Sequence, residues 1–222
     1  MHLLRLDSAE LNLFYPLAFP KPISYLFPKL VRMKKITPLI SFVLLMILSA
    51  NTYAQSQEEM QKWMAYMTPG AMHQMLAKST GSWNEELTMW NAPGAPPEKM
   101  TASCEMKMIM GGRYQEERHT GTFNNMPFED YSIIGYDNNK KVFQSMWIDN
   151  MGTGISHMEG TYDAATKMVT LTGKMMDAMT GKEEDVKQTW KFVDDNTQMV
   201  EMYKVTDGKE FKTMEIKLTR KS

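Results

Sequence analysis

From Gly81 to the end of the chain, apolar and polar residues alternate with a period of two, which is typical of half-buried β-strands. Short sequences rich in Gly, Asn, Asp and Pro separate the alternating runs and predict turns. Most of these connections are too short to hold a crossover helix, so consecutive strands are expected to be antiparallel neighbours. The predicted strands are residues 82–91, 99–110, 113–123, 128–137, 141–149, 154–162, 167–176, 185–194, 198–206 and 210–220.

This pattern predicts an all-β domain over residues 81–222. About ten regularly spaced antiparallel strands form a meander, and closing a meander removes its exposed edges. We therefore expect a ten-stranded antiparallel up-and-down barrel. A β-sandwich is the alternative.

A helical pattern precedes the strands, in residues 55–80. Apolar residues recur there at spacings of three and four in two short stretches, each giving one apolar stripe. Thr68 and Pro69 lie between the stretches and predict the end of one helix and the N-terminal cap of the next. Such helices could plug the barrel mouth or dock on a partner protein. The two stripes are Met60, Trp63, Met64 and Met67, followed by Met72, Met75 and Leu76.

Residues 33–54 have the pattern of a signal peptide, with a short basic start, an apolar core over 36–49 and small residues before a cleavage site at Gln55. The apolar core is too short for a membrane span, which needs roughly 20 apolar residues. Residues 1–32 hold four prolines and no regular period, which predicts an upstream extension arising from a misassigned start. An unusually long basic start is the alternative. The mature chain is thus expected to be exported, to the periplasm or beyond the cell.

The charge of the chain argues against two classes of partner. The full chain carries 25 basic and 26 acidic residues, and from residue 55 onward 19 basic and 24 acidic residues remain. A mildly acidic protein has no electrostatic reason to bind nucleic acid or anionic lipid. We expect no nucleic acid partner and no integral membrane span in the mature chain, and the sequence gives no oligomeric state.

Metal and cofactor chemistry finds little support in the sequence, and no cofactor is expected. Cys104 is the only cysteine, so an internal disulfide is excluded. Alternation places it on the same strand face as Ala102 and Met106, which predicts a buried, inert thiol, a reactive thiol being the alternative. No histidine has the spacing of a zinc motif. The histidines after the cleavage site are His73, His119 and His157.

Methionine is unusually frequent, with 24 residues in the chain. Met106, Met108 and Met110 alternate and are expected to share one strand face. Thioethers are soft ligands suited to Cu(I), so such a cluster raises the possibility of a copper site. Methionine also fills irregular apolar space in a core or an adaptable pocket, and we favour this interpretation.

The strand predicted at 113–123 is polar on both faces. Polar groups that face a barrel interior need partners, but barrels that hold a ligand accommodate them in a wet or ligand-filled pocket. Arg113, Tyr114 and Glu117 are therefore candidate pocket residues, with Arg113 expected to pair with a ligand carboxylate or with Glu117. A strand with both faces in water at a frayed rim is the alternative.

Three further pocket candidates come from residues 147–157, and Trp83 is a fourth. Trp147 and Asp149 share a face before a Gly-rich turn, which suits an apolar wall and a polar anchor at a pocket mouth. The structural interpretation, which we favour, makes Asp149 the acceptor of an Asx-turn. His157 could face the interior beside Glu159 or lie on the surface.

The blocks GGR (111–113), PFE (127–129), IIGYD (133–137), WIDNMGTG (147–154) and EGTYD (159–163) occur in this order. Together with the flanking segments they resemble the bacterial family known as domain of unknown function 1579, over residues 76–220. The resemblance implies a calycin-like barrel, and Gly81-Ser82-Trp83 is similar to the Gly-x-Trp start of lipocalins. It implies no activity, cofactor or catalytic residue.

Three functional hypotheses remain open from the sequence. The first is a barrel that binds a small, mainly apolar ligand. The second is an enzyme that uses the same pocket, with Asp149 or Glu117 as base and Arg113 stabilising an anion. No catalytic signature supports the second. The third is a Met-rich interaction or copper-binding protein.

Overall fold

The structure is a computed structural model that describes residues 56–222. The predicted upstream extension and signal peptide lie outside the described residues. Two helices precede the strands: one spans 56–67 and the other is α2 (Ala71–Lys78). Among the described residues, no helix combines the length and the apolar character needed to cross a membrane.

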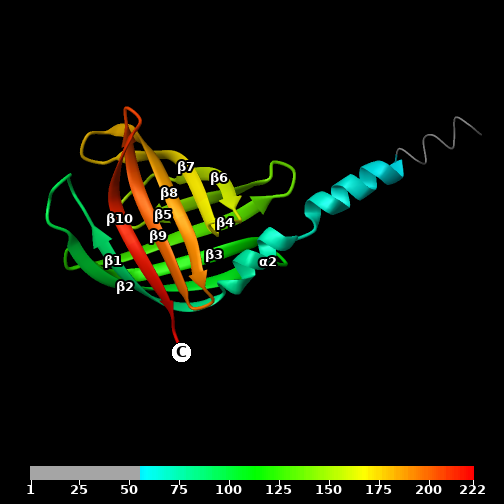
Figure 1. Ribbon diagram of the computed structural model, residues 1–222, viewed down its shortest axis with the longest axis horizontal. Coiled ribbons are helices and arrows are strands. Elements are labelled where there is room, and N and C mark those ends of the chain that lie inside the picture. The colour runs from blue at the N-terminus through cyan, green and yellow to red at the C-terminus, as the bar shows by residue number, and fades with distance from the viewer. Residues whose placement is uncertain (1–55) are drawn as a thin grey trace, which may run out of the picture. The chain divides into compact units, whose positions relative to one another are not determined.

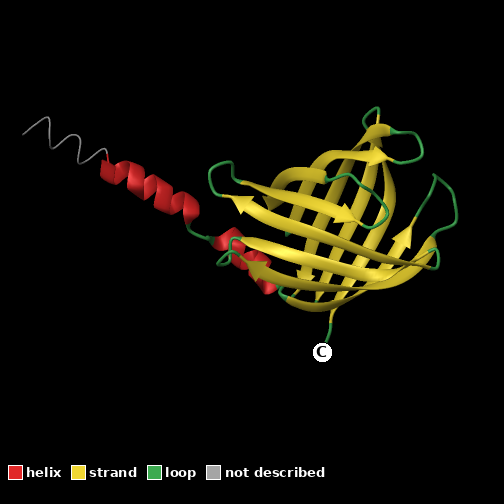
Figure 2. Ribbon diagram, turned by 180° about the vertical axis from the view of Figure 1, so that it is seen from behind, coloured by secondary structure: helices red, strands yellow, loops and turns green. Residues whose placement is uncertain are grey.

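Ten strands form one closed barrel, in which every strand pairs antiparallel with its neighbours in sequence and β1 pairs with β10 (Figure 1). Figure 2 shows the barrel from behind, with both helices at one side of the strands. The predicted all-β up-and-down barrel is thereby confirmed. The strands are β1 (Gly81–Met89), β2 (Glu98–Ile109), β3 (Tyr114–Phe123), β4 (Met126–Asp137), β5 (Val142–Asp149), β6 (Ser156–Asp163), β7 (Met168–Asp177), β8 (Lys182–Asp194), β9 (Thr197–Thr206) and β10 (Lys209–Arg220).

Short turns set the register of the hairpins. Asn124 and Asn125 join β3 to β4 with φ values of 51° and 62°, a left-handed pair that matches the twist of a two-residue hairpin. The predicted start of the next strand at residue 128 was too late, since β4 begins at Met126. Met126 and Pro127 already pair within β4, since the two asparagines complete the turn by themselves.

The end of the barrel that carries α2 is filled by side chains. Phe143, Val169 and Leu171 are fully buried there and pack with Trp190 and with Leu76 of α2. A second cluster packs Trp83, Cys104, Met106 and Leu218 together. Burial of large apolar side chains contributes roughly 1.5–3 kcal/mol each, so this end supplies much of the stability of the fold.

Helix α2 lies against β2, β3 and β4 and closes this end of the barrel. Leu76 is fully buried, and its carbonyl accepts a hydrogen bond of 2.8 Å from Gln115 Nε2 on β3. The predicted stripe of Met72, Met75 and Leu76 faces the core. This second helix therefore plugs the barrel rather than presenting its apolar side to solvent.

The start of α2 differs from the prediction. Its N-cap is Gly70, whose N–H donates to His73 Nδ1 at 3.0 Å. Thr68 was predicted to be the cap, but its hydroxyl donates to the Met64 carbonyl instead and so closes the preceding helix. The predicted break between the two helices is correct, and only the cap assignment was wrong.

Helix 56–67 exposes its predicted apolar stripe. Trp63 is 55% exposed, and Met60 and Met64 are exposed as well. The helix is joined to the barrel at its C-terminal end, where Asn138 of the β4–β5 turn donates hydrogen bonds to three main-chain carbonyls. The hypothesis that these helices dock on a partner therefore concerns helix 56–67, and it stays a prediction.

Candidate functional site

A cavity of about 340 Å³ occupies the half of the barrel farther from α2. It reaches the ends of β1, β3, β5 and β7 and the starts of β2, β4 and β6, and it is bounded by the middle of β8 and β9 and by Met214, Ile216 and Leu218 of β10. Trp147, Trp190, Phe123 and Phe128 supply aromatic walls. Eight methionines also line it: Met89, Met100, Met106, Met151, Met158, Met175, Met202 and Met214.

The Met106–Met108–Met110 face expected from alternation forms only in part, since Met106 and Met108 both point into the barrel but Met110 does not. Met106 lines the cavity and Met108 packs against the core. Met110 is 70% exposed with φ at 49°, because β2 ends at Ile109 and the chain turns there. The methionines of the cavity come instead from strands all around the barrel.

One wall of this apolar cavity is polar. The ionisable residues that line it come from β1, β3 and β4, and they are Glu85, Glu117, His119 and Asp130. Cys104 of β2 is fully buried beside them. Cys104 pairs with His119 across the β2–β3 ladder, and His119 pairs with Asp130 across the β3–β4 ladder. Four neighbouring strands, β1 to β4, thus bring these side chains together.

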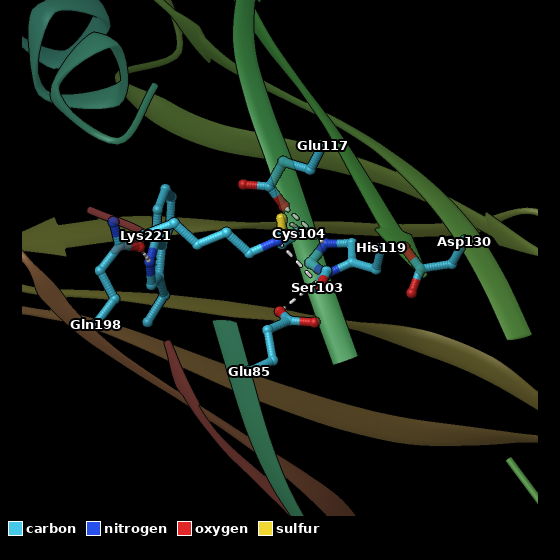
Figure 3. A network of polar contacts seen from close by, with 9 residues as sticks. Glu85, Ser103, Cys104, Glu117, His119, Asp130, Gln198 and Lys221 are labelled. Atoms are coloured by element: carbon cyan, nitrogen blue, oxygen red, sulfur yellow. Dashed lines mark hydrogen bonds and ion pairs between the residues drawn. The ribbon is translucent and has the colours of Figure 1, made fainter. Parts of the chain in front are cut away.

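The ring of His119 is the centre of the polar wall (Figure 3). Its Nδ1 lies 2.9 Å from Glu85 Oε1, a hydrogen-bond distance. Its Nε2 faces three acceptors: Cys104 Sγ at 3.6 Å, Glu117 Oε2 at 3.6 Å and Asp130 Oδ1 at 3.8 Å. Both ring nitrogens are therefore surrounded by acceptors.

Burial perturbs the ionisation of this wall. Burial raises the pKa of the Cys104 thiol to about 12. Burial also raises the pKa of Asp130 to about 6, although the charge of His119 and a hydrogen bond from Trp147 offset part of the shift. Burial alone would lower the pKa of His119, but its contacts with Cys104, Glu117 and Glu85 raise that pKa well above its ordinary value. Strongly perturbed groups in a cavity are typical of functional sites.

Two of the residues predicted from sequence line this cavity. Glu117 is buried on its polar wall, and Trp147 lies across the β4–β5 ladder from Ser132, another lining residue. Trp83 does not line it. Trp83 is fully buried at the α2 end, where its indole N–H donates to the Ser79 carbonyl at 2.9 Å.

Arg113, Tyr114 and His157 lie elsewhere. They line a separate, open depression on the outer side of the barrel, near the helices. Arg113 Nη1 donates to the Met110 carbonyl within its own turn, so the predicted Arg113–Glu117 pair does not form. His157 and Glu159 also line this outer depression, so of the two positions left open for His157 the structure has the outer one, because alternation along β6 puts Met158 inside.

Asp149 is the acceptor of an Asx-turn, which is the role that the structural interpretation of the sequence predicted for it. Its Oδ1 accepts hydrogen bonds from the main-chain N–H groups of Met151 and Gly152, at 2.6 and 2.7 Å. It does not line the cavity, and neither does Arg113. The enzyme hypothesis that combined Asp149 as base with Arg113 as anion stabiliser therefore has no geometric support.

We expect Asp149→Ala to lower the free energy of unfolding by about 1–2 kcal/mol, because two main-chain donors lose a charged acceptor. Asp149→Asn keeps an oxygen at the same place and should cost less. Urea denaturation of the two variants measures the difference. Equal losses would show that the Asx-turn contributes nothing to stability.

Sequence reasoning did not single out Glu85, His119 or Asp130 as site residues, and it treated Cys104 only as an inert thiol. The positions of the turns in the sequence do indicate which of these residues lie opposite each other. The β2–β3 hairpin is symmetric about Gly111 and Gly112, which places residue 104 opposite 119. The β3–β4 hairpin is symmetric about its two asparagines, which places residue 119 opposite 130. Locating both turns to the residue would have predicted that Cys104, His119 and Asp130 lie side by side, and Glu85 depends in addition on the register of β1 with β2.

The family described as a protein of unknown function (DUF1579) matches residues 68–220, which is all of the barrel and helix α2. The chain belongs to the DUF1579 family. This DUF1579 barrel has no match among curated proteins. The family relationship therefore brings no activity with it.

Two solved structures are among those similar to this chain. The crystal structure of Rv2717c from M. tuberculosis is similar with a TM-score of 0.51 and 13% identity, over 70% of this chain and 100% of that chain. The structure of the S-type phycobiliprotein lyase CPES from Guillardia theta has a TM-score of 0.46 and 10% identity, over 72% of this chain and 96% of that chain. At such identities the likeness of the DUF1579 barrel to Rv2717c concerns the fold alone.

Proposed function

We propose that this protein binds a small, mainly apolar molecule inside its barrel. The observation that carries the proposal is the cavity of about 340 Å³ with aromatic and methionine walls. Its volume falls within the range of small-molecule sites, about 300–1,000 Å³, and such sites are mostly apolar with a few placed polar groups. Methionine side chains adapt their shape, which suits a flexible ligand or a set of related ligands.

The polar wall sets the orientation of the ligand in this proposal. Glu85 and Glu117 are buried, and Asp130 lines the same side of the cavity. Carboxylates accept hydrogen bonds and do not donate them when ionised. A ligand with an apolar body and a hydrogen-bond donor at one end fits this distribution.

We further propose that the barrel works outside the cytoplasm. The support is the pattern of residues 33–54, with its basic start, apolar core and cleavage motif before Gln55. N-terminal sequencing of the protein recovered from the cell exterior or periplasm tests this. A mature chain beginning at or near Gln55 is expected, and an uncleaved chain in the cytoplasm would contradict it.

Filling the cavity should abolish ligand binding. Ser132 is buried and lines the cavity beside Trp147. We expect Ser132→Phe to weaken binding of the neutral probe N-phenyl-1-naphthylamine at least about tenfold, which corresponds to about 1.4 kcal/mol. Titration followed by probe fluorescence measures the affinity.

Ile133→Phe is the matched control, because the next residue on β4 points to the outer depression. It should bind the probe like the unaltered protein. Thermal melting of both variants separates loss of the cavity from loss of the fold. The absence of saturable probe binding by the unaltered protein, or equal binding by the Ser132→Phe variant, would contradict an apolar ligand site.

A further inference from the structure

We propose that Cys104 and His119, together with carboxylate oxygens of Glu117 and Asp130, bind one divalent metal ion of the zinc class on the polar wall of the cavity. This site goes beyond the binding of an apolar molecule and does not depend on it. It would place a metal ion at the polar end of the cavity, within reach of a bound ligand.

The first support is the convergence of donor atoms from separate strands. Glu85, Cys104 and His119 each offer one ligand atom within 4.8 Å of the other two. They belong to β1, β2 and β3, so the barrel itself assembles the group. A thiol, an imidazole and carboxylates are the donors from which proteins build zinc sites.

The second support is the spacing around His119 Nε2. The two carboxylate oxygens, at 3.6 and 3.8 Å, are too far from Nε2 for good hydrogen bonds. Sγ at 3.6 Å is at the distance of a weak sulfur contact. Ligand atoms bound tetrahedrally to one zinc ion at about 2.0–2.3 Å are about 3.3–3.6 Å apart. The distances of these three atoms from Nε2 are therefore closer to those between ligands of one metal ion than to those of good hydrogen bonds.

The third support is the orientation of the ring. Nδ1 of His119 lies 2.9 Å from Glu85 Oε1, and the side chain of Glu85 is only 2% exposed. Metal-binding histidines commonly donate their second N–H to a carboxylate, which fixes the ring and directs the other nitrogen at the metal. Glu85 is thus assigned as a positioning residue, and Nε2 as the nitrogen that binds.

The burial of Asp130 also favours a cation at this wall. Its side chain is only 10% exposed, and its Oδ1 is buried with no hydrogen-bond partner among the described residues. This oxygen faces the same Nε2 as Sγ and Glu117 Oε2. A buried carboxylate oxygen without a partner is costly, and a metal ion beside it would remove that cost.

The charges agree with a cationic occupant. The wall holds Glu85, Glu117 and Asp130, and within it the only basic side chain is His119. The thiol of Cys104 is unpaired with any other cysteine, because the chain has no second one. Sulfur remains available to a metal even in an oxidising compartment, where paired cysteines would form disulfides.

Cobalt substitution tests the site in the reduced, full-length chain after chelator treatment and dialysis. We expect Co²⁺ to saturate at one equivalent, with a thiolate-to-cobalt charge-transfer band in the near ultraviolet, and Zn²⁺ to displace it. Cys104→Ser should abolish the band. Glu85→Gln should weaken Co²⁺ binding about 10–100-fold while keeping the band, as expected for a positioning residue.

His157→Gln is the matched control, since His157 lies on the outer side of the barrel. It should leave the Co²⁺ affinity and the band unchanged. The absence of a saturable band, or a band that survives in the Cys104→Ser variant, would overturn the proposal.

A second measurement does not depend on the folding of any variant. Zinc-edge X-ray absorption of the unaltered protein with one equivalent of Zn²⁺ should find one sulfur ligand and otherwise nitrogen and oxygen ligands. A coordination sphere without sulfur would overturn the site. Binding of the fluorescent probe to the metal-free protein tests the apolar ligand site separately, so that failure of one proposal is distinguished from failure of the other.

Discussion

Gly160→Ala is expected to destabilise the protein by at least about 3 kcal/mol or to prevent its folding. A Cβ on Gly160 would lie 1.8 Å from the Thr170 carbonyl oxygen and 2.8 Å from Leu171 Cα. Both are backbone atoms of the neighbouring strand β7, with which β6 pairs. A flexible side chain could move away, but a paired strand cannot shift by this amount without breaking its ladder.

Gly154→Ala is the control for this prediction, because a Cβ there meets no atom within 4 Å and its φ is not in the left-handed region. It should change the free energy of unfolding by less than about 0.5 kcal/mol. Circular dichroism and urea denaturation of both variants give the comparison. A Gly160→Ala protein as stable as the control would show that β6 and β7 are less tightly apposed than described.

Trp83→Ala should lower the free energy of unfolding by about 3–5 kcal/mol and leave probe binding in the cavity intact. The side chain is fully buried, its N–H donates to the Ser79 carbonyl, and the Arg220 guanidinium lies 4.3 Å from the centre of its ring. Arg220 in turn donates to the carbonyls of Lys78, the last residue of α2, and Thr80. The tryptophan therefore connects the first strand, the last strand and the helix.

The Trp83 prediction is checked by denaturation and by a probe titration carried out well below the melting temperature. Trp83→Phe keeps most of the ring and should recover a large part of the lost stability, but not the hydrogen bond to Ser79. Unchanged stability with a lost affinity for the probe would instead make Trp83 a residue of the ligand site.

The architecture was predictable because its determinants are local. Alternation identified each strand, and short turns such as Asp207-Gly208 left no room for crossover connections. The turn between β3 and β4 was misplaced by one or two residues. That error does not change the topology, but it does change which residues face each other across the ladder.

The candidate site was predictable only in part, since alternation sorts residues into two faces without saying which face is inside. Glu117 and Trp147 do line the cavity. Arg113 was grouped with the inner face, but it belongs to the turn before β3. Asp149 shares a face with Trp147 in the pattern, yet its carboxylate is used by the turn that ends β5.

His119 illustrates why the cluster itself escaped the sequence. Its contacts lie 34 residues away at Glu85 and 15 residues away at Cys104. Such spacings match no local metal motif, because they depend on strand lengths rather than on one turn or helix. Only the register of three hairpins brings the groups together.

The division of the cavity wall has a consequence for how this barrel can diversify. All the ionisable lining residues come from β1, β3 and β4, whereas β7, β9 and β10 contribute apolar side chains such as Met175, Met202 and Ile216. Substitutions on the apolar strands can therefore enlarge, narrow or reshape the cavity while its electrostatic character is inherited unchanged. Two relatives could then accommodate molecules of different size and outline and still hold them by the same polar end.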